Sequence, residues 1–421
     1  MKKVMILSSL LLLANGATIT ELFNAIEKTP DYKLDSIAKK EMKINKNSVV
    51  SSLYPKLTLQ ASAEHFNRYN SIVPLTPTQS AELTKTNGDI PFSQNIQRIG
   101  FEISMPLFIK SIYDNKNKMT YLVNATNYQT KINLYKKQTL LVGYLSKFDY
   151  LFALKKALLK QQNSIQTTYD GMKKGVKIGR IPEFKLLRLQ DSLNQIKIKL
   201  SSVNQNIDEV KASILKVTNI ELDSPISFDS MPIENGEFIA LKPLKETLKA
   251  NEYGLKAKKD NNYPKVIIKI QGNRAYAKAY NTDNDISEDF ASAGIYLSWD
   301  IFNKKNNSDI QKSKIELIKN KLEIAKTKKD LMADVVKIDK SLKEIERQVL
   351  ITKDSIKVKE ELLKGAKVAF KLNRMTVDEY LKYEDDLARI RADFANLIAN
   401  KNMLKAQKAL IYGKNLKKVF K

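Results

Sequence analysis

Side chains that could carry out chemistry are few in this sequence. It contains one histidine, His65, and no cysteine, so no histidine or thiolate metal cluster is expected. His65 lies at the end of a predicted strand, where a position at the rim of the sheet is the simpler interpretation. Neighbouring carboxylates such as Asp385 and Asp386 occur in helical segments and indicate a solvated or interhelical face rather than a catalytic acid and base. We therefore expect no enzyme, no metal and no cofactor.

Charged residues recur in two short segments that are 194 positions apart. The segment VKIGRIPEFKLLRLQDSLNQIK begins at Val176, and FKLNRMTVDEYLKYEDDLARIR begins at Phe370. In this register Arg180 matches Arg374. Arg374 and Asp378 are four residues apart, and on a helix surface that spacing gives an ion pair worth only about 0.2–0.5 kcal/mol. The matching order of residues nevertheless indicates that the two segments occupy equivalent places in the fold.

Long helices are predicted to position these segments. Residues 111–171 contain no proline and would span about 90 Å as one helix. The next helix is predicted to start around Pro182, because proline suits the first helical turn. Its apolar residues recur at spacings of three and four as far as Val217, which is typical of a coiled coil. The same spacing is found at 335–349 and 387–397.

A β-hairpin is predicted before each pair of helices. YPKLTLQASAEHF starts at Tyr54 and YPKVIIKIQGNRA at Tyr263, and the return strands are IGFEISMPLF and AGIYLSWDIF. These segments alternate between apolar and polar residues, which predicts strands with one face of each kind. The apolar-face residues include Leu57, Leu59, Ile103, Met105, Ile268 and Leu297. Aromatic residues at the strand ends are Tyr54, Phe108, Tyr263, Trp299 and Phe302.

The chain is thus predicted to be duplicated. The expected parts are a signal peptide (1–16), a first repeat (17–218, with a hairpin at about 54–108 and helices at about 111–217), a middle layer (219–262), a second repeat (263–413, with a hairpin at about 263–302 and helices at about 305–412) and a basic tail (414–421). The first hairpin has the longer connection, NSIVPLTPTQSAELTKTNGDIPF, whose prolines and Asn-Gly favour turns.

The composition favours a folded, exported protein. Lys2 and Lys3 precede an apolar run and small residues near Ala17, which is the layout of a secretory signal peptide, and the absence of cysteine argues against a lipid anchor. The formal charge is +26, or +24 once the two lysines of the signal peptide are removed. The lysines are scattered among acidic residues on helical faces and no nucleic-acid motif accompanies them, so a solvated basic surface is expected rather than DNA binding.

Any membrane crossing must use strands. Beyond the signal peptide no stretch approaches the roughly 18 apolar residues that a membrane-spanning helix needs. Four strands cannot close a barrel, since the smallest transmembrane barrels use eight, and lipid tolerates no open sheet edge. If these strands span a membrane, several chains must share one barrel, with the strand-end aromatics forming a girdle.

The sequence resembles the TolC family of outer-membrane efflux proteins. The resemblance is carried by the strand openings LYPKLTLQASAE and NYPKVIIKIQGN, the returns FEISMPLF and IYLSWDIF, and the two segments from Val176 and Phe370, in the order hairpin, long helix, tip, helix, twice. It implies a mainly α-helical protein with a β-barrel portion: a homotrimer with a twelve-stranded barrel in the outer membrane of a Gram-negative bacterium and a periplasmic tunnel of helices. It also implies docking to a periplasmic adaptor and an inner-membrane pump.

The resemblance further implies a gate where the helix tips converge, here residues 171–184 and 365–380. Arg374 and Asp378 match an arginine and an aspartate of the family's second tip. In the first tip Arg180 occupies the position equivalent to Arg374. Phe184 stands where the repeat would place an acid equivalent to Asp378, and Glu183 lies beside it. Three copies of Arg374 near a threefold axis would repel one another unless carboxylates offset them. Asp378 and Glu183 are the available partners.

Two other classes of protein share some of these features. A secreted, basic coiled-coil structural protein or adhesin would have the signal peptide and the heptads, but no reason for four alternating strands. An intracellular nucleic-acid-binding scaffold would explain the charge but not the signal peptide. For the channel, efflux of small toxic compounds is favoured over type I protein secretion.

Overall fold

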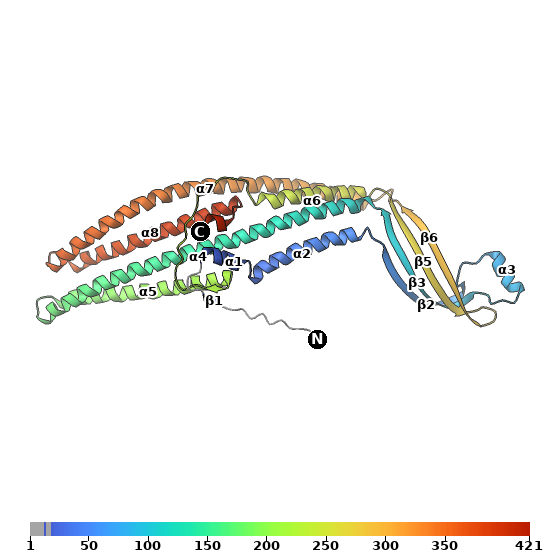
Figure 1. Ribbon diagram of the computed structural model, residues 1–421, viewed down its shortest axis with the longest axis horizontal. Coiled ribbons are helices and arrows are strands. Elements are labelled where there is room, and N and C mark those ends of the chain that lie inside the picture. The colour runs from blue at the N-terminus through green and yellow to red at the C-terminus, as the bar shows by residue number, and fades with distance from the viewer. Residues whose placement is uncertain (1–11, 14–17) are drawn as a thin grey trace. The chain divides into compact units, whose positions relative to one another are not determined.

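The computed structural model describes residues 12–13 and 18–421 of the chain (Figure 1). The predicted signal peptide lies outside these residues, except for Leu12–Leu13. This pair forms β1, which is parallel to β4 (Ile220–Glu221). In the described residues no helix combines the length and the apolarity needed to cross a membrane.

The chain forms two compact units that cut across the predicted repeats. One unit contains the described residues up to Lys39, together with Thr126–Pro243 and Ile324–Lys421. The other contains Lys40–Ala125 and Leu244–Glu323. Both repeats therefore contribute to each unit.

A four-stranded antiparallel sheet dominates the second unit. The strands are β2 (Lys56–Ser71), β3 (Phe92–Phe108), β5 (Lys265–Lys278) and β6 (Asp285–Ser298), and they lie side by side in the order β2-β3-β5-β6 (Figure 1). Among the described residues β2 and β6 are the edges of the sheet, and no further strand pairs with their outer backbone groups. The strands begin and end close to the positions that the alternation predicts, although β3 starts earlier than the quoted return strand.

The two hairpin connections differ in length and content. Residues 72–91 join β2 to β3 and contain helix α3 (Pro77–Lys85), which the turn-rich sequence did not predict. Thr76 and Gln79 form a capping box at its start, and Pro77 occupies the first turn. Residues 279–284 join β5 to β6 as a short turn.

The long helices repeat with the same offset as the sequence. They are α4 (Lys110–Lys177), α5 (Glu183–Thr218), α7 (Lys304–Lys371) and α8 (Val377–Ile411). The starts of α4 and α7, and of α5 and α8, are each 194 residues apart. Shorter helices are α1 (Ile19–Ile26), α2 (Pro30–Ser51), α6 (Leu241–Asp260) and α9 (Leu416–Val419).

The main hydrophobic core lies in the first unit. It is built from the heptad residues of α5, such as Leu189, Leu193 and Ile196, packed with apolar residues of α4, such as Leu158 and Ile165. The spacing of three and four keeps these side chains on one stripe, which is buried while the other residues of α5 are half-buried or exposed. A mainly helical fold with a separate sheet, as predicted, is therefore confirmed for the single chain.

The two loops at the helix tips have one geometry. Each contains a left-handed residue at the same repeat position, Gly179 with φ 72° and Asn373 with φ 56°. The amide after it donates a hydrogen bond five residues back, at 2.9 Å to Gly175 in one loop and at 2.9 Å to Ala369 in the other. This is the Schellman pattern that closes a helix, for which glycine and asparagine are the suited residues.

Candidate functional site

The apolar face of the sheet is continuous across all four strands. Directly paired residues share a face, and Leu57 pairs with Ile103, which pairs with Ile270. Residues paired across the strands in this way form rows. The neighbouring rows on the same face contain the rest of the six residues that were predicted to face lipid. Several of them are open to the surroundings: Leu59 is 80% exposed and Leu297 is 67% exposed. The structure thus brings the predicted residues together, whereas contact with lipid remains a prediction.

The opposite face of the sheet is polar. Its rows include Lys56, Ser104 and Lys269, and one row further Thr58, Glu102 and Gln271. Lys269 and Glu102 form an ion pair of 3.9 Å. Gly100 lies on this face where β3 and β5 approach closely, and a Cβ there would meet the Gly272 carbonyl at 2.5 Å. The face is suited to water, and this glycine permits the close approach of its strands.

The predicted girdle aromatics gather at one end of the sheet. Tyr54 and Tyr263 precede β2 and β5, while Phe108 ends β3 and Trp299 follows β6. All are exposed, as is Phe302. The Trp299 indole donates a hydrogen bond of 2.8 Å to the Asn262 carbonyl. An apolar ring with one anchored polar atom is the type of side chain that favours a membrane interface.

A second aromatic group lies at the opposite end of the strands, and sequence reasoning missed it. Tyr69 of β2 and Tyr280 after β5 meet edge to face with their ring centroids 4.6 Å apart. Tyr276, near the end of β5, is also exposed. Tyrosines at both distal strand ends, in RYN and KAYN, were the available signal. The sheet therefore carries aromatics at both ends of its apolar face.

The four predicted gate residues are exposed on the tips of the helices. Arg180 and Glu183 flank the first loop, and Arg374 lies in the second. The Asp378 carboxylate lies 3.8 Å from the Arg188 guanidinium, which links α8 to α5. Both side chains of this pair are well exposed, so the pair contributes little to stability. The role of the four residues as a latch remains a prediction about several copies.

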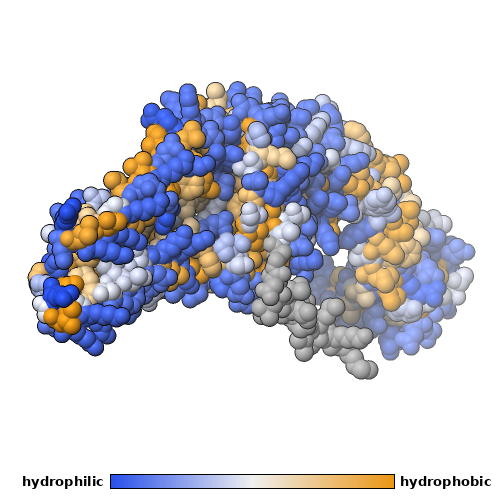
Figure 2. Space-filling model, turned by 60° about the vertical axis from the view of Figure 1, so that its left-hand side comes forward, coloured by the Kyte–Doolittle hydropathy of each residue, from blue (hydrophilic) through white to orange (hydrophobic). Residues whose placement is uncertain are grey.

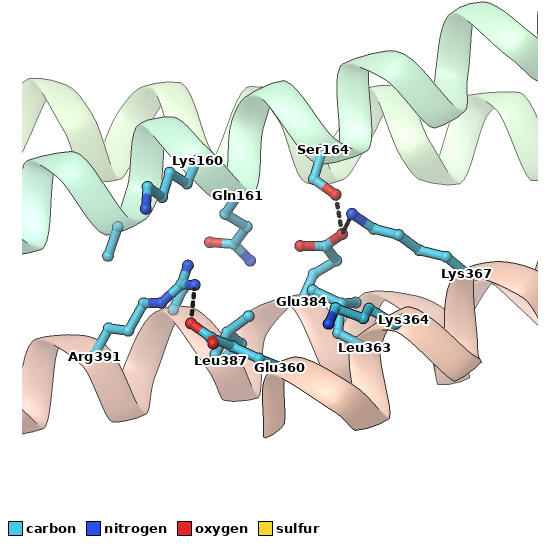
Figure 3. Close-up of a pocket in the computed structure, with 12 residues that line it drawn as sticks. Lys160, Gln161, Ser164, Glu360, Leu363, Lys364, Lys367, Glu384, Leu387 and Arg391 are labelled. Atoms are coloured by element: carbon cyan, nitrogen blue, oxygen red, sulfur yellow. Dashed lines mark hydrogen bonds and ion pairs between the residues drawn. The ribbon is translucent and has the colours of Figure 1, made fainter. Parts of the chain in front are cut away.

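A buried polar cluster lies between α4, α7 and α8 (Figure 3). Glu384 of α8 is 3% exposed and accepts a hydrogen bond of 2.7 Å from the Tyr380 hydroxyl and another from Ser164 of α4. Lys367 of α7 lies 3.6 Å from the same carboxylate. Burial raises the pKa of Tyr380, so its hydroxyl stays protonated and donates.

The cluster borders a cavity of about 390 Å³ and joins the two halves of the chain. Thr168 of α4 adds a hydrogen bond of 3.0 Å to the Tyr380 hydroxyl, and the Tyr380 ring stacks on Phe370. Because every polar group named here has a partner, the buried carboxylate is tolerated and fixes how α8 meets α4. We attribute no chemistry to it. In the described residues no group of three or more metal-ligating side chains is present.

The carboxylates considered at the outset, Asp385 and Asp386, directly follow Glu384 in α8 and point to other sides of the helix. Asp386 pairs with Lys359 at 3.1 Å, and Asp385 pairs with Lys199 of α5 at 3.7 Å. Both therefore lie at contacts between helices.

Comparisons with known proteins identify the fold. Neither a family model nor a curated protein matches the sequence. Among solved structures the chain is similar to CusC, a transmembrane channel, with 11% identity, a TM-score of 0.77 and coverage of 95% of this chain and 93% of that one. It is similar to the outer-membrane protein VceC from Vibrio cholerae (11% identity, TM-score 0.76, 94% and 96% covered). It is also similar to the CmeC outer-membrane channel of Campylobacter jejuni (14% identity, TM-score 0.74, 94% and 85% covered).

The chain has the fold of the outer-membrane channels. These neighbours are channels of the TolC family, so the resemblance stated from the sequence is confirmed at the level of fold. The similarity extends over nearly the whole of this chain and includes both the sheet and the helices.

Proposed function

We propose that the chain is one of three subunits of an outer-membrane exit duct. In this proposal the sheets of three copies close a twelve-stranded barrel in the outer membrane, and the helices form a periplasmic tunnel. The observation that carries the proposal is the sheet itself. It has one exposed apolar face, one polar face and two open edges, in a chain with the fold of outer-membrane channels.

The dimensions of the sheet support the membrane assignment. Its strands have 14 to 17 residues, which exceeds the roughly 9–11 that a tilted strand needs to cross a bilayer. A sheet with exposed apolar side chains such as Leu59 would aggregate in water, whereas lipid would cover this face. Pairing of β2 with β6 of another copy would satisfy both edges, as lipid requires.

The duct would act with a periplasmic adaptor and an inner-membrane pump. These partners are inferred from the family resemblance. We propose small toxic compounds as the cargo, on the basis of the resemblance to a family of efflux proteins. The duct would pass whatever an attached pump delivers, so metals and secreted polypeptides are the alternatives. The signal peptide and the outer-membrane location belong to the same proposal.

The proposal is tested by deleting the gene and by reconstituting the purified protein. Deletion should raise sensitivity to detergents and dyes, and complementation with the wild-type gene should reverse it. The protein should also produce discrete conductance steps in planar bilayers. Unchanged sensitivity together with loss of a secreted protein would reassign the duct to protein secretion. A protein that is stable in detergent but gives no conductance would refute the channel.

A further inference from the structure

The cavity beside the Glu384 cluster has an excess of positive charge. Its basic lining residues are Lys160 of α4, Lys364 and Lys367 of α7, and Arg391 of α8. Its acidic lining residues are Glu360 and Glu384. Four basic and two acidic side chains give the lining a formal charge of +2. The cavity is therefore better suited to an anion than to a cation.

Both carboxylates of the cavity already have basic partners. Glu384 lies 3.6 Å from Lys367 and also accepts the two hydrogen bonds described above. Glu360 accepts a hydrogen bond of 2.6 Å from Arg391. Because each carboxylate is paired, neither is left to neutralise the remaining positive charge.

Lys160 is left without an acidic partner. Its side chain forms no ion pair and no hydrogen bond with the residues that the structure describes, whereas Lys364 lies 2.6 Å from Glu361. Figure 3 shows the head groups of Lys160 and Arg391 facing each other from α4 and α8. Arg391 has five N–H groups and uses only part of this set for Glu360. Two cations that face each other repel, and an anion between them would be stabilised by both.

A buried amide next to Lys160 also lacks a partner. Gln161 of α4 lines the cavity and is 6% exposed. Its Oε1 is buried and accepts no hydrogen bond from the described part of the chain. The side chain points into the cavity (Figure 3). Since an unpaired buried acceptor is unfavourable, a ligand that donates a hydrogen bond here would remove this cost.

Basic side chains alone would not mark a binding site on this protein. Hydrophilic residues cover much of the helical surface that Figure 2 shows, and the chain has 72 lysine and arginine residues. The cavity differs because it combines an unpaired lysine and an unpaired buried amide around a volume of about 390 Å³. A small oxyanion fits in this volume together with its waters, since a water occupies about 30 Å³.

We propose that this cavity binds inorganic phosphate. In hydrogen phosphate, oxygens without a proton would accept hydrogen bonds from Lys160 and Arg391. Its remaining hydroxyl would donate to the Gln161 Oε1. The bound ion would join α4 of the first repeat to α8 of the second. The site lies within one chain, so it does not depend on the proposed channel.

The Gln161 acceptor predicts which oxyanion binds best. Sulfate has the same shape and charge as hydrogen phosphate but carries no proton at neutral pH, so it cannot donate to Oε1. A phosphate monoester has a second pKa of about 6 and has lost its last proton at pH 8. Free phosphate should therefore bind more tightly than sulfate or a phosphate monoester.

Equilibrium dialysis of the purified full chain in detergent against radiolabelled phosphate tests the site. At pH 8 and constant ionic strength, wild type should bind one phosphate per chain in a saturable manner. Lys160→Ala should weaken binding about tenfold or more, because a charge-assisted hydrogen bond is lost. Lys156→Ala is the matched control, since Lys156 is an exposed residue one turn earlier on α4 and does not line the cavity. No saturable binding by wild type, or equal weakening in the two lysine variants, would overturn the proposal.

Competition tests the identity of the ligand. Unlabelled phosphate should displace the label at lower concentration than sulfate or glycerol phosphate, and Gln161→Leu should remove the preference over sulfate. Sulfate that competes as well as phosphate in wild type would overturn the contact with Gln161. Glycerol phosphate that competes better would overturn the free ion in favour of a phosphate monoester.

A stability measurement guards against binding too weak for dialysis. At constant ionic strength, phosphate should raise the thermal midpoint of wild type and of Lys156→Ala but not of Lys160→Ala, because a ligand stabilises the folded state to which it binds. The same rise in all three proteins would overturn the site. Conductance of the wild-type protein would be unaffected by this result, so the proposed function stands or falls separately.

Discussion

Individual residues of the sheet have opposite expected roles although they are neighbours in sequence. Leu59 and Gln60 are adjacent, yet their side chains point to opposite faces, and Leu59 lies in the apolar row with Phe101. Leu59→Arg should impair membrane assembly, because a charge on the lipid face near the midplane costs about 2–4 kcal/mol. Gln60→Arg should be tolerated. The effect of each variant is measured as the amount of trimer in the outer-membrane fraction. Equal amounts would contradict the assignment of Leu59 to the lipid face and Gln60 to the polar face.

The same comparison can be made one strand further on. Ile103→Arg should reduce assembly, and Ser104→Arg should not, since Ser104 lies in the polar row with Lys56 and Lys269.

At the tips, the charged residues can be tested one by one. Arg374→Ser or Asp378→Ala should raise single-channel conductance in planar bilayers if these residues hold a latch, and moderate salt should loosen the wild type. Arg188→Ala is the control for loss of the contact within the chain, because Arg188 lies 3.8 Å from Asp378. Intact trimers of Arg374→Ser and Asp378→Ala with wild-type conductance would leave all these residues as ordinary helix surface.

A partly buried carboxyl in α4 should make stability depend on pH. Asp149 lines a cavity with Phe152, Pro225 and Ile226, and burial raises its pKa to about 7. The folded state then holds a proton that the unfolded state releases above a pKa of about 3.9. The neutral Asp149 carboxyl therefore contributes fully to the free energy of unfolding below pH ~3.9, and this contribution is lost as the pH rises to about 7.

Asp149→Asn should therefore remove this dependence. We expect a higher thermal midpoint than wild type at pH 7.5 and a smaller difference at pH 5, measured in the same detergent. Identical pH profiles for the two proteins would show that Asp149 is hydrated in the folded state.

Sequence reasoning succeeded for residues whose placement follows from a local period. Alternation by two placed Leu57 and Ile103 on one face, and the structure pairs them directly. It could not find the cluster around Glu384, because Ser164 is 220 residues away and nothing local marks the two as neighbours. The pairing of Asp378 with Arg188, rather than with Arg374 four residues away, depends likewise on how α5 and α8 pack.

Among the elements, each of the two tip loops needs a residue in the left-handed conformation at the same repeat position, which is Gly179 in one loop and Asn373 in the other. Gly179 has φ 72°, a conformation that costs a side-chain-bearing residue about 1–2 kcal/mol. Gly179→Ala should thus lower the thermal midpoint. Gly171→Ala is the matched control: Gly171 lies inside α4 with open space around its missing Cβ, so alanine there should stabilise by about 0.5–1 kcal/mol. Shifts of the same sign in both variants would contradict the loop geometry.

The long helices and the strands could be predicted because the pattern of each one occurs twice in the sequence. The start of α5 at Glu183, directly after Pro182, agrees with the proline signal. Helix α3 was missed, because prolines and Asn-Gly outweighed a nine-residue helix that depends on its capping box. Helix α2 has no buried residue, so no apolar period in its sequence marks it.

For the whole molecule, the central claim is that one chain is an incomplete part of a channel. In this proposal the open edges of the sheet would pair with strands of further copies, and lipid would cover its exposed apolar face. None of these surfaces has a purpose in a monomeric secreted coiled-coil protein, which is the main alternative class.

The native mass of the protein after extraction from separated cell membranes tests this claim most directly. The account predicts that the protein is found in the outer-membrane fraction and that, once the bound detergent is subtracted, its mass is three times that of the mature chain. A monomer in the soluble periplasmic or secreted fraction would contradict it.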